Sequence, residues 1–157
     1  SSLAFLREVD AINLRRRARL VELALDACDG LPGGRRIAVL GAAFKPRSDD
    51  IRDSPALDVA ERLASFGADV VITDPRAADR VAESRPQLTV ARSLEEAVSG
   101  AELILLLTEW PEYVELNPVA LREFVDRTVI IDGRNALDPD RWRAAGWTYR
   151  GLGRAGS

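Results

Sequence analysis

The spacing of apolar residues changes along the chain and divides it into two parts. In residues 3–29 apolar positions recur at nearly helical spacing, which predicts one long helix. The glycines and the proline of residues 30–34 end it. Such a helix would be ~40 Å long, which favours a connector between domains or an oligomer contact. The alternative is an ordinary N-terminal helix packed on its own domain.

After residue 34, short uninterrupted apolar runs alternate with stretches of helical character. Uninterrupted runs are typical of strands that are covered on both faces. The predicted strands are 36–41, 69–73, 88–91, 102–107, 128–132 and 147–150. The predicted helices, three of them with Ser54, Ser93 and Asn117 at their N-caps, are 54–66, 77–84, 93–98, 117–126 and 138–145.

Alternating strands and helices predict an α/β fold, a doubly wound parallel sheet (Rossmann-like) preceded by the long N-terminal helix. We assign residues 1–30 to that helix and residues 35–153 to the sheet domain. In such sheets ligands bind beyond the carboxyl ends of the strands. A binding site is therefore expected in the loops that follow strands, which are 41–53, 74–76, 108–116 and 133–136.

Composition excludes several classes of protein. The chain has 157 residues, a net charge of −3, one cysteine and no histidine. The negative charge argues against a nucleic-acid binder that relies on positive charge, and the apolar runs are too short to span a membrane. A single cysteine fits a reducing compartment, so we expect a cytoplasmic protein. Without histidine no metal site of the usual zinc type is expected, and a Ser-His-Asp triad is impossible within this chain.

The most irregular loop, residues 41–55, carries the most distinctive chemistry. It holds Lys45, the single lysine among 22 cationic residues. An ammonium that is not replaced by arginine suits a tight site, because a planar guanidinium does not fit there. Three carboxylates and three cations crowd residues 45–53, just before the positive end of a predicted helix. This pattern predicts a site for a phosphate- or carboxylate-bearing ligand, and the alternative is a solvated charged turn.

The segment GAAFKPRSDDIRDSPAL, residues 41–57, resembles a loop of the UDP-glucose/GDP-mannose dehydrogenase family. In that family the pattern is approximately G-x-x-F-K-x-x-[ST]-D-D-x-R-x-S-P, in the C-terminal domain that binds the nucleotide sugar. Asp74-Pro75, the DGRN segment at 132–135 and YRGLGR at 149–154 add to the resemblance, as does Asn13 before a basic stretch. The resemblance covers essentially the whole chain.

The resemblance implies which residues contact ligands. Phe44 and Lys45 match the pair that contacts the nucleotide sugar, with the lysine near the sugar and phosphates. Arg134 matches an arginine that binds the substrate. Arg52 matches an arginine that reaches the NAD of the partner half-site.

Four polar residues are implied to support these contacts rather than to react. Asp49 and Asp50 match acidic positions that we expect to orient the cations of the loop. Asp132 and Asn135 are expected to shape the turn that carries Arg134. In the same way, residues 1–30 would be the connecting and dimerisation helix, and residues 35–153 the UDP-binding domain.

Two parts of the family's machinery do not occur in this chain. No G-x-G-x-x-G segment opens a helix, and no glycine-rich loop holds a catalytic cysteine. Cys28 lies within the long helix and is expected to be structural. The covalent chemistry of the family needs an activated thiolate and a base, so we expect no catalytic residue here and an inactive fragment. NAD, the implied cofactor, would be bound mainly by an N-terminal domain that this chain lacks.

The implied activity of the intact enzyme is oxidation of UDP-glucose to UDP-glucuronate with two NAD. UDP-glucose is preferred only because it is common in the family, and UDP-N-acetylmannosamine and GDP-mannose are alternatives. The expected partners are a UDP-sugar, the NAD domain and a second copy bound through the long helix. A stand-alone nucleotide-sugar binding module is a further alternative, and a receiver-like signalling domain is disfavoured because the one lysine lies in the first loop.

Several residues have two interpretations. Trp110 either packs around the nucleotide base or packs within its own loop, while Trp142 and Trp147 are expected in the core or at its edge. The basic residues between Arg15 and Arg19 form either a solvated helix face, or an interface or phosphate contact.

Overall fold

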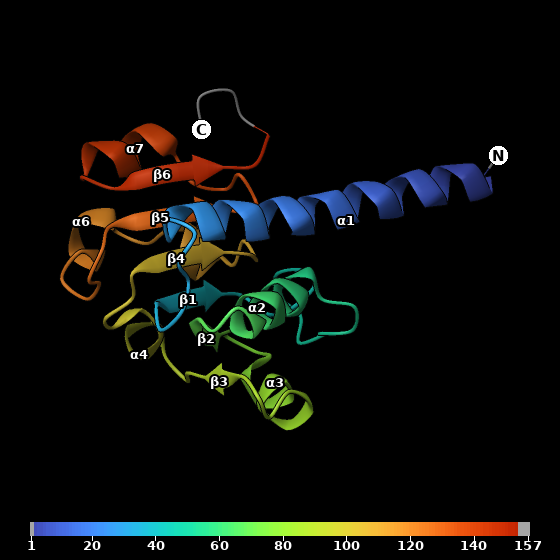
Figure 1. Cartoon of the computed structure of the whole chain (residues 1–157), viewed down its shortest axis with the longest axis horizontal. Helices are drawn as coiled ribbons and strands as arrows, with labels where there is room; N and C mark the ends of the chain where they lie inside the picture. Colours follow the sequence, from blue (N-terminus) through green and yellow to red (C-terminus); the bar gives the residue numbers. More distant parts are fainter. Residues whose placement is uncertain (1, 154–157) are drawn as a thin grey trace.

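The computed structural model describes residues 2–153; Ser1 and residues 154–157, with the last residue of the YRGLGR segment, lie outside the described part. Figure 1 shows a sheet with helices around it and a long leading helix. The helices are α1 (Ser2–Ala27), α2 (Pro55–Ser65), α3 (Ala78–Ser84), α4 (Leu94–Val98), α5 (Pro111–Val114), α6 (Pro118–Leu121) and α7 (Pro139–Ala144). The strands are β1 (Arg36–Leu40), β2 (Asp69–Thr73), β3 (Thr89–Val90), β4 (Leu103–Leu106), β5 (Val129–Asp132) and β6 (Thr148–Gly151).

The six strands form one parallel sheet in the order β3-β2-β1-β4-β5-β6. The predicted doubly wound parallel fold is therefore confirmed. β1 lies between β2 and β4, with Leu40 level with Thr73 on one side and with Leu106 on the other. The strand order reverses between β1 and β4, and the crevice at such a switch point is where open α/β sheets bind ligands.

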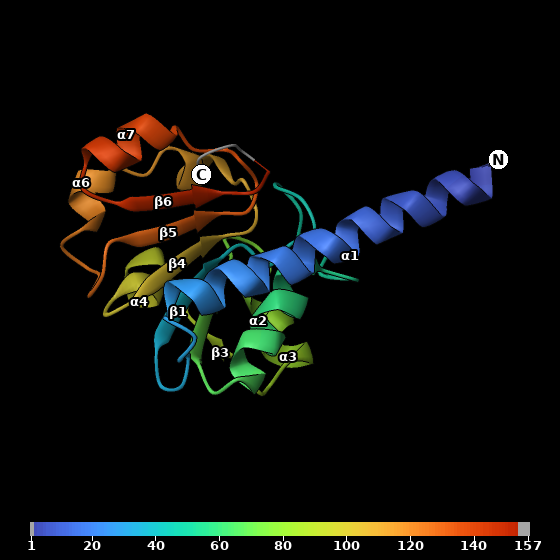
Figure 2. The ribbon, with the colours of Figure 1, turned by 45° about the horizontal axis from the view of Figure 1, so that its top comes forward.

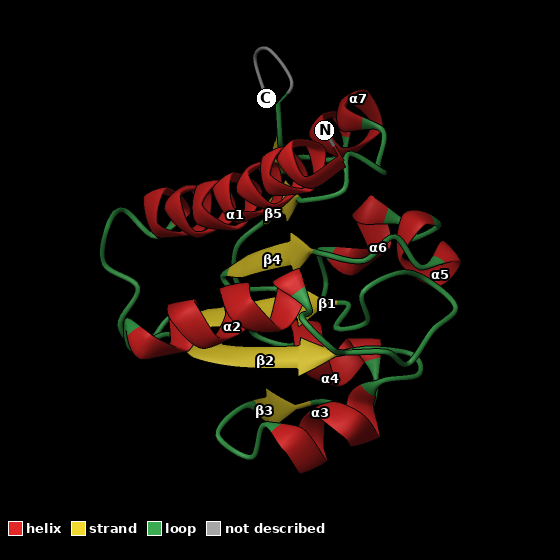
Figure 3. Ribbon diagram, turned by 90° about the vertical axis from the view of Figure 1, so that its right-hand side faces the viewer, coloured by secondary structure: helices red, strands yellow, loops and turns green. Residues whose placement is uncertain are grey.

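Helices cover both faces of the sheet. α1 and α2 pack against each other on one face, where α1 also contacts β4 and β5 and α2 contacts β2 (Figures 1 and 2). α4 lies behind the sheet in Figure 2 and contacts β1 and β2. Right-handed crossovers explain this, because the chain moves from β1 to β3 in one direction and from β3 to β6 in the other. Figure 3 shows the strands enclosed between the helical layers.

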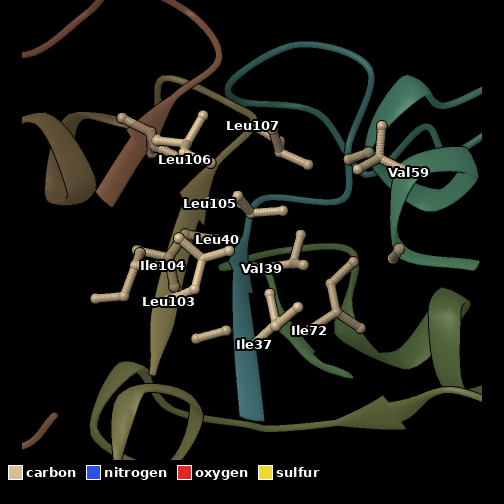
Figure 4. Packing of buried hydrophobic residues seen from close by; sticks show 14 of the residues in the cluster. Ile37, Val39, Leu40, Val59, Ile72, Leu103, Ile104, Leu105, Leu106 and Leu107 are labelled. Carbon is tan, nitrogen blue, oxygen red and sulfur yellow. The ribbon is translucent and has the colours of Figure 1, made fainter. Parts of the chain in front are cut away.

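The core consists of the central strands and the inner faces of the helices. Every residue of β4 and β5 is buried, as are four of the five residues of β1. Figure 4 shows how Val39 and Leu105 lie between the helices, with Val59 of α2 packed from one side. Burial on both faces is the physical reason why these strands carry uninterrupted apolar runs.

Three helix starts agree with the predicted caps, and at the start of α6 Asn117 Oδ1 accepts from Val119 N at 2.9 Å. Ser54 accepts a hydrogen bond from Leu57 N and precedes Pro55, the first residue of α2. Ser93 Oγ accepts from Glu96 N at 3.1 Å. The Glu96 carboxylate, however, accepts from Arg92 N at 3.3 Å, one residue earlier than the reciprocal bond of a capping box.

The segment between β4 and β5 differs from the prediction. The helix expected to run to residue 126 ends at Leu121, after which successive i→i+3 hydrogen bonds form tighter turns as far as Phe124. A four-residue helix, α5, lies where a plain loop was expected. Elements this short have too few turns to show a helical period in the sequence.

α1 is packed along its second half and exposed along its first. Leu20 and Leu23 of α1 are buried in the core, and Gly30 N donates to Leu25 O to close the helix. Cys28 is buried as well, but it follows the last residue of α1 rather than lying within the helix as predicted. Ile12, in the amino-terminal half of the helix, is 41% exposed. Figure 1 shows why: the amino-terminal half of α1 extends beyond the sheet. No helix within residues 2–153 is both long enough and apolar enough to cross a membrane.

Candidate functional site

Asp74, the first residue after β2, holds together the loops that follow β1 and β2. Its side chain is buried at the carboxyl edge of the sheet. One carboxylate oxygen accepts from Ala42 N at 2.8 Å and from Ala43 N at 3.0 Å. The other accepts from Arg76 N at 2.9 Å and from Ala77 N at 2.8 Å. These donors satisfy the buried charge and fix the point at which the loop 41–53 leaves the sheet.

The loop after β4 closes on the same point. Thr108 Oγ1 donates to Ala43 O at 2.9 Å, and Trp110 Nε1 donates to Asp74 Oδ2 at 3.2 Å. Gly41 makes this approach possible, because its φ is +104° and a Cβ there would lie 2.5 Å from Thr108 Cβ. Trp110 is only 4% exposed and packs between its own loop and the loop after β2. The loops after β1, β2 and β4 therefore form one connected unit at the switch point.

The tip of the loop 41–53 presents Phe44 and Lys45 to solvent. Phe44 is 52% exposed, although its backbone N is held by Asp50 O at 2.8 Å. Lys45 is exposed as well. Within residues 2–153 its ammonium makes no hydrogen bond and no ion pair. An exposed aromatic residue and a cation with no partner in the described chain thus follow each other on a loop whose base is fixed.

The carboxylates of this loop each hold an arginine. Asp50 binds the Arg52 guanidinium through both oxygens, with two contacts of 3.0 Å. These hydrogen bonds lower the pKa of the Asp50 carboxyl to about 2. Asp49 accepts from Arg80 Nε at 2.9 Å. Arg52, the expected NAD contact, therefore turns toward its own loop in this chain.

Asp132 organises the turn after β5. It is completely buried, with Arg134 N bonded to Oδ1 at 3.1 Å. Its Oδ2 accepts from Leu137 N at 2.8 Å and from the Tyr149 hydroxyl at 2.7 Å. Asn135 takes a left-handed φ of +52° and donates to Leu152 O. Hydrogen bonds at Arg134 N, Leu137 N and the Asn135 side chain consequently fix the backbone of this turn.

Glu109 is a partner of Arg134 that sequence analysis missed. Arg134 Nε donates to Glu109 Oε2 at 2.6 Å, and Arg134 Nη2 lies 3.3 Å from Oε1. Glu109 belongs to no motif. Its position could have pointed to it: Glu109 follows β4, Arg134 follows β5, and the two strands are neighbours in the sheet. A carboxylate on the loop after β4 thus holds this arginine.

A cavity of about 410 Å³ lies between α1 and the turn after β5. It is lined by Ile12, Arg15, Arg16, Arg19, Gly133, Arg134, Asn135, Leu152 and Gly153. Neither Phe44 nor Lys45 lines it. The structure therefore brings Arg134 and Asn135 to one cavity, beside Asp132, and leaves the predicted residues of the loop 41–53 in a separate group.

The arginines between Arg15 and Arg19 of α1 lie in two different environments. Arg17 is 9% exposed, and its guanidinium lies 3.4 Å from both Asp53 Oδ1 and Asp58 Oδ2. It fastens α1 to α2 and to the end of the loop 41–53, so a solvated helix face is the wrong interpretation for this residue. Its neighbours Arg15 and Arg16 are exposed and face the cavity.

Cys28 shows none of the features of a nucleophile. It is 1% exposed, and burial raises the pKa of its thiol. A reactive cysteine needs a lowered pKa and access to solvent. No group of three or more His, Cys, Asp or Glu residues within the described chain is arranged to hold a metal ion.

Several nucleotide-sugar dehydrogenases are similar to this chain in sequence and in fold. The model of the UDP-glucose/GDP-mannose dehydrogenase family, UDP binding domain, matches residues 38–139. The chain is 35% identical over 150 residues to UDP-glucose 6-dehydrogenase YwqF of Bacillus subtilis (strain 168), covering 95% of this chain and 34% of that protein. The chain thus spans about a third of the length of the curated relatives it matches.

Solved structures of nucleotide-sugar dehydrogenases are also similar to this chain. A UDP-glucose dehydrogenase from Pyrobaculum islandicum aligns with a TM-score of 0.70 and 32% identity, over 96% of this chain and 31% of that one. A UDP-D-ManNAc dehydrogenase from Pyrococcus horikoshii aligns with a TM-score of 0.70 and 33% identity, over 88% of this chain and 30% of that one. The matched residues 38–139 contain the loop held by Asp74 and the turn held by Asp132. This chain therefore belongs to the UDP-glucose/GDP-mannose dehydrogenase family and corresponds to its UDP-binding domain.

Proposed function

We propose that this chain is the substrate-binding part of a nucleotide-sugar 6-dehydrogenase that oxidises UDP-glucose. The observation that carries the proposal is the loop 41–53, in which Phe44 and the unpaired Lys45 project from a base fixed by Asp74. The negative charge of a bound diphosphate would pair with the Lys45 ammonium. Phe44 offers an apolar surface to the sugar or base. The family match supports the assignment, because it includes this loop.

Arg134 completes the proposed contacts with the substrate. Its guanidinium is paired with Glu109, so a substrate oxygen would compete with that carboxylate. Asp132 and Asn135 support the turn through hydrogen bonds to Arg134 N and Leu152 O. Asp50 orients Arg52 of the first loop, whereas Asp49 binds Arg80 of α3, outside that loop. Arg52 would reach the cofactor only after it leaves Asp50.

In the intact enzyme the reaction would convert the C6 hydroxymethyl group of the sugar to a carboxylate. NAD, when bound, supplies the oxidant for both oxidation steps. The NAD domain and the catalytic cysteine would lie on a part of the protein outside this chain. The residues described here would bind and orient the substrate.

The arrangement of the whole protein is part of the same proposal. Residues 1–30 would connect the two domains and bring two subunits together, and residues 35–153 would bind UDP. The exposed apolar side chains Leu3, Phe5 and Leu14 on the amino-terminal half of α1 support this, since a second surface would cover them. The protein would act in the cytoplasm.

The test is NADH formation by the full-length protein, offered UDP-glucose, UDP-N-acetylmannosamine and GDP-mannose in parallel. Two NADH per UDP-glucose is the expected result. Activity on another of these sugars alone would keep the class of reaction and replace the substrate, which is a real alternative because one similar structure is a UDP-D-ManNAc dehydrogenase. Folded protein that binds UDP-sugars without forming NADH would indicate a binding module instead.

A further inference from the structure

The loop 41–53 contains two residues with an unusual backbone conformation. Arg47 has a φ of +61° and Asp53 a φ of +48°, in the left-handed region that residues other than glycine rarely occupy. They enclose the segment 48–52, and Arg47 follows Lys45 by two positions. A left-handed conformation at such a residue costs free energy, so it persists only where the surrounding structure holds it.

An arginine from outside the loop binds the backbone of each of these two residues. Arg76, in the turn after β2, donates from Nη1 to Arg47 O at 2.9 Å. Arg17 of α1 donates from Nη2 to Asp53 O at 3.3 Å, and the same nitrogen lies 3.4 Å from Asp53 Oδ1. Two guanidinium groups from segments far apart in the sequence thus hold the two left-handed residues.

Both arginines are themselves fixed. Arg76 N donates to Asp74 Oδ1 at 2.9 Å, so its side chain extends from the same carboxylate that fixes the base of the loop. Arg17 is 9% exposed, and its Nη1 lies 3.4 Å from Asp58 Oδ2 of α2. A guanidinium can bind partners on two elements because its donors point in several directions within one plane. Arg17 therefore ties the loop, drawn in teal in Figure 1, to the position of α1.

The two contacts act on Phe44 and Lys45 through the backbone. Phe44 N donates to Asp50 O at 2.8 Å, which joins the tip of the loop to the segment between the left-handed residues. If Arg47 or Asp53 left its conformation, that segment would shift. The Phe44–Lys45 pair would then shift with it.

We infer that Arg17 and Arg76 are positioning residues for substrate binding: they hold the two left-handed residues and so place Phe44 and Lys45. The inference rests on the proposed function, in which Phe44 and Lys45 contact the nucleotide sugar. It adds two arginines that act on the substrate only through the loop. It also makes substrate affinity depend on how α1 lies against the sheet domain.

The test is Arg76→Ala in the full-length protein, because Arg76 is exposed and its loss should leave the fold intact. Steady-state kinetics with UDP-glucose give KM and kcat, and mass spectrometry follows amide hydrogen exchange in residues 42–54. We expect KM to rise about 5- to 20-fold with kcat within about twofold of the wild type, as the loss of one charged hydrogen bond that affects binding alone predicts. Amide exchange in the loop should be faster by about fivefold or more.

Arg122→Ala is the matched control. Arg122 is also exposed and also donates to a backbone oxygen, that of Ala145 at 3.3 Å, but it lies outside the loop 41–53. Its KM and its loop exchange should stay within about twofold of the wild type. Arg17→Lys tests the second contact on protein that urea unfolding shows to be folded, and should raise KM about 3- to 10-fold because an ammonium lacks the planar fork.

A second substitution separates positioning from a general loss of stability. Asparagine occupies left-handed conformations more readily than arginine, so Arg47→Asn should reduce the need for the contact with Arg76. When it is added to Arg76→Ala, KM should fall by about threefold or more toward the wild-type value. A loss of stability elsewhere in the fold would leave KM high.

An unchanged KM in Arg76→Ala, or a raised KM that Arg47→Asn does not lower, would overturn the inference. Lys45→Ala separates it from the proposed function: if Lys45→Ala raises KM and Arg76→Ala does not, the inference alone fails. A wild type that forms no NADH from UDP-glucose would remove the proposed function. The exchange measurement would then decide by itself whether the two arginines hold the loop.

Discussion

The carboxylate of Asp74 accepts a hydrogen bond from the indole of Trp110, although the two residues follow different strands. The distance is 3.2 Å, and the same oxygen also accepts from Ala42 N and Ala43 N. One buried side chain thus joins the loop that carries Lys45 to the loop that carries Glu109, the partner of Arg134. This is the physical connection between the two groups of proposed substrate contacts.

Asp74→Asn should destabilise the fold by about 2–4 kcal/mol, because an amide replaces an acceptor-only group and leaves buried donors unpaired. Asp69→Asn is the matched control, since Asp69 lies exposed at the start of the same strand. Urea unfolding of both variants measures the difference. Equal stability of the two variants would show that Asp74 does not hold the loops together.

Gly41→Ala should cost more than ~2 kcal/mol of stability. The added Cβ would lie 2.5 Å from Thr108 in a backbone conformation that alanine disfavours. Gly34→Ala separates the two effects, since Gly34 has a φ of +74° with nothing within 4 Å of its Cβ. It should lose only about 1 kcal/mol, and a comparable loss in both variants would argue against the close approach of the loops after β1 and β4.

The sequence specified the sheet well and the site only in part. The strands could be predicted because burial on both faces requires uninterrupted runs of apolar residues. The glycines within 30–34 indicated where the long helix ends. The loop 41–53 carried a recognisable motif. The contrast between Arg17, which is buried in ion pairs, and Arg16, which faces the cavity, could not be predicted. It depends on how α1 lies across the sheet, and adjacent basic residues in a sequence do not report that packing.

The pKa of Asp50 gives a pH prediction. Because Arg52 lowers it from about 3.8 to about 2 in the folded chain, the contribution of this pair to stability is fully present above pH ~4. It is lost as the pH falls through about 2. A carboxyl-carbon NMR titration should place the midpoint near 2 at low salt, and Arg52→Gln should return it toward 3.8. An unshifted midpoint in the wild type would contradict the bidentate contact, which salt should weaken because both groups are exposed.

Cys28 should react slowly in the folded protein. Its thiol is buried, and burial raises its pKa, so little thiolate is accessible near pH 8. A disulfide reagent such as DTNB should label it at least about 100-fold faster in denaturant than in buffer, by analogy with other buried thiols. Rapid labelling under native conditions would show that the packing of α1 on the sheet opens easily.

The binding of UDP-glucose to variants at Lys45 tests the central claim most directly. Lys45→Ala should weaken binding about 10- to 100-fold, and Lys45→Arg should also weaken it if the site requires a compact ammonium. Arg47→Ala provides a cation control from the same exposed loop and should bind like the wild type. Wild-type affinity in Lys45→Ala, measured by calorimetry on folded protein, would contradict the assignment of the loop 41–53 as the substrate-binding element.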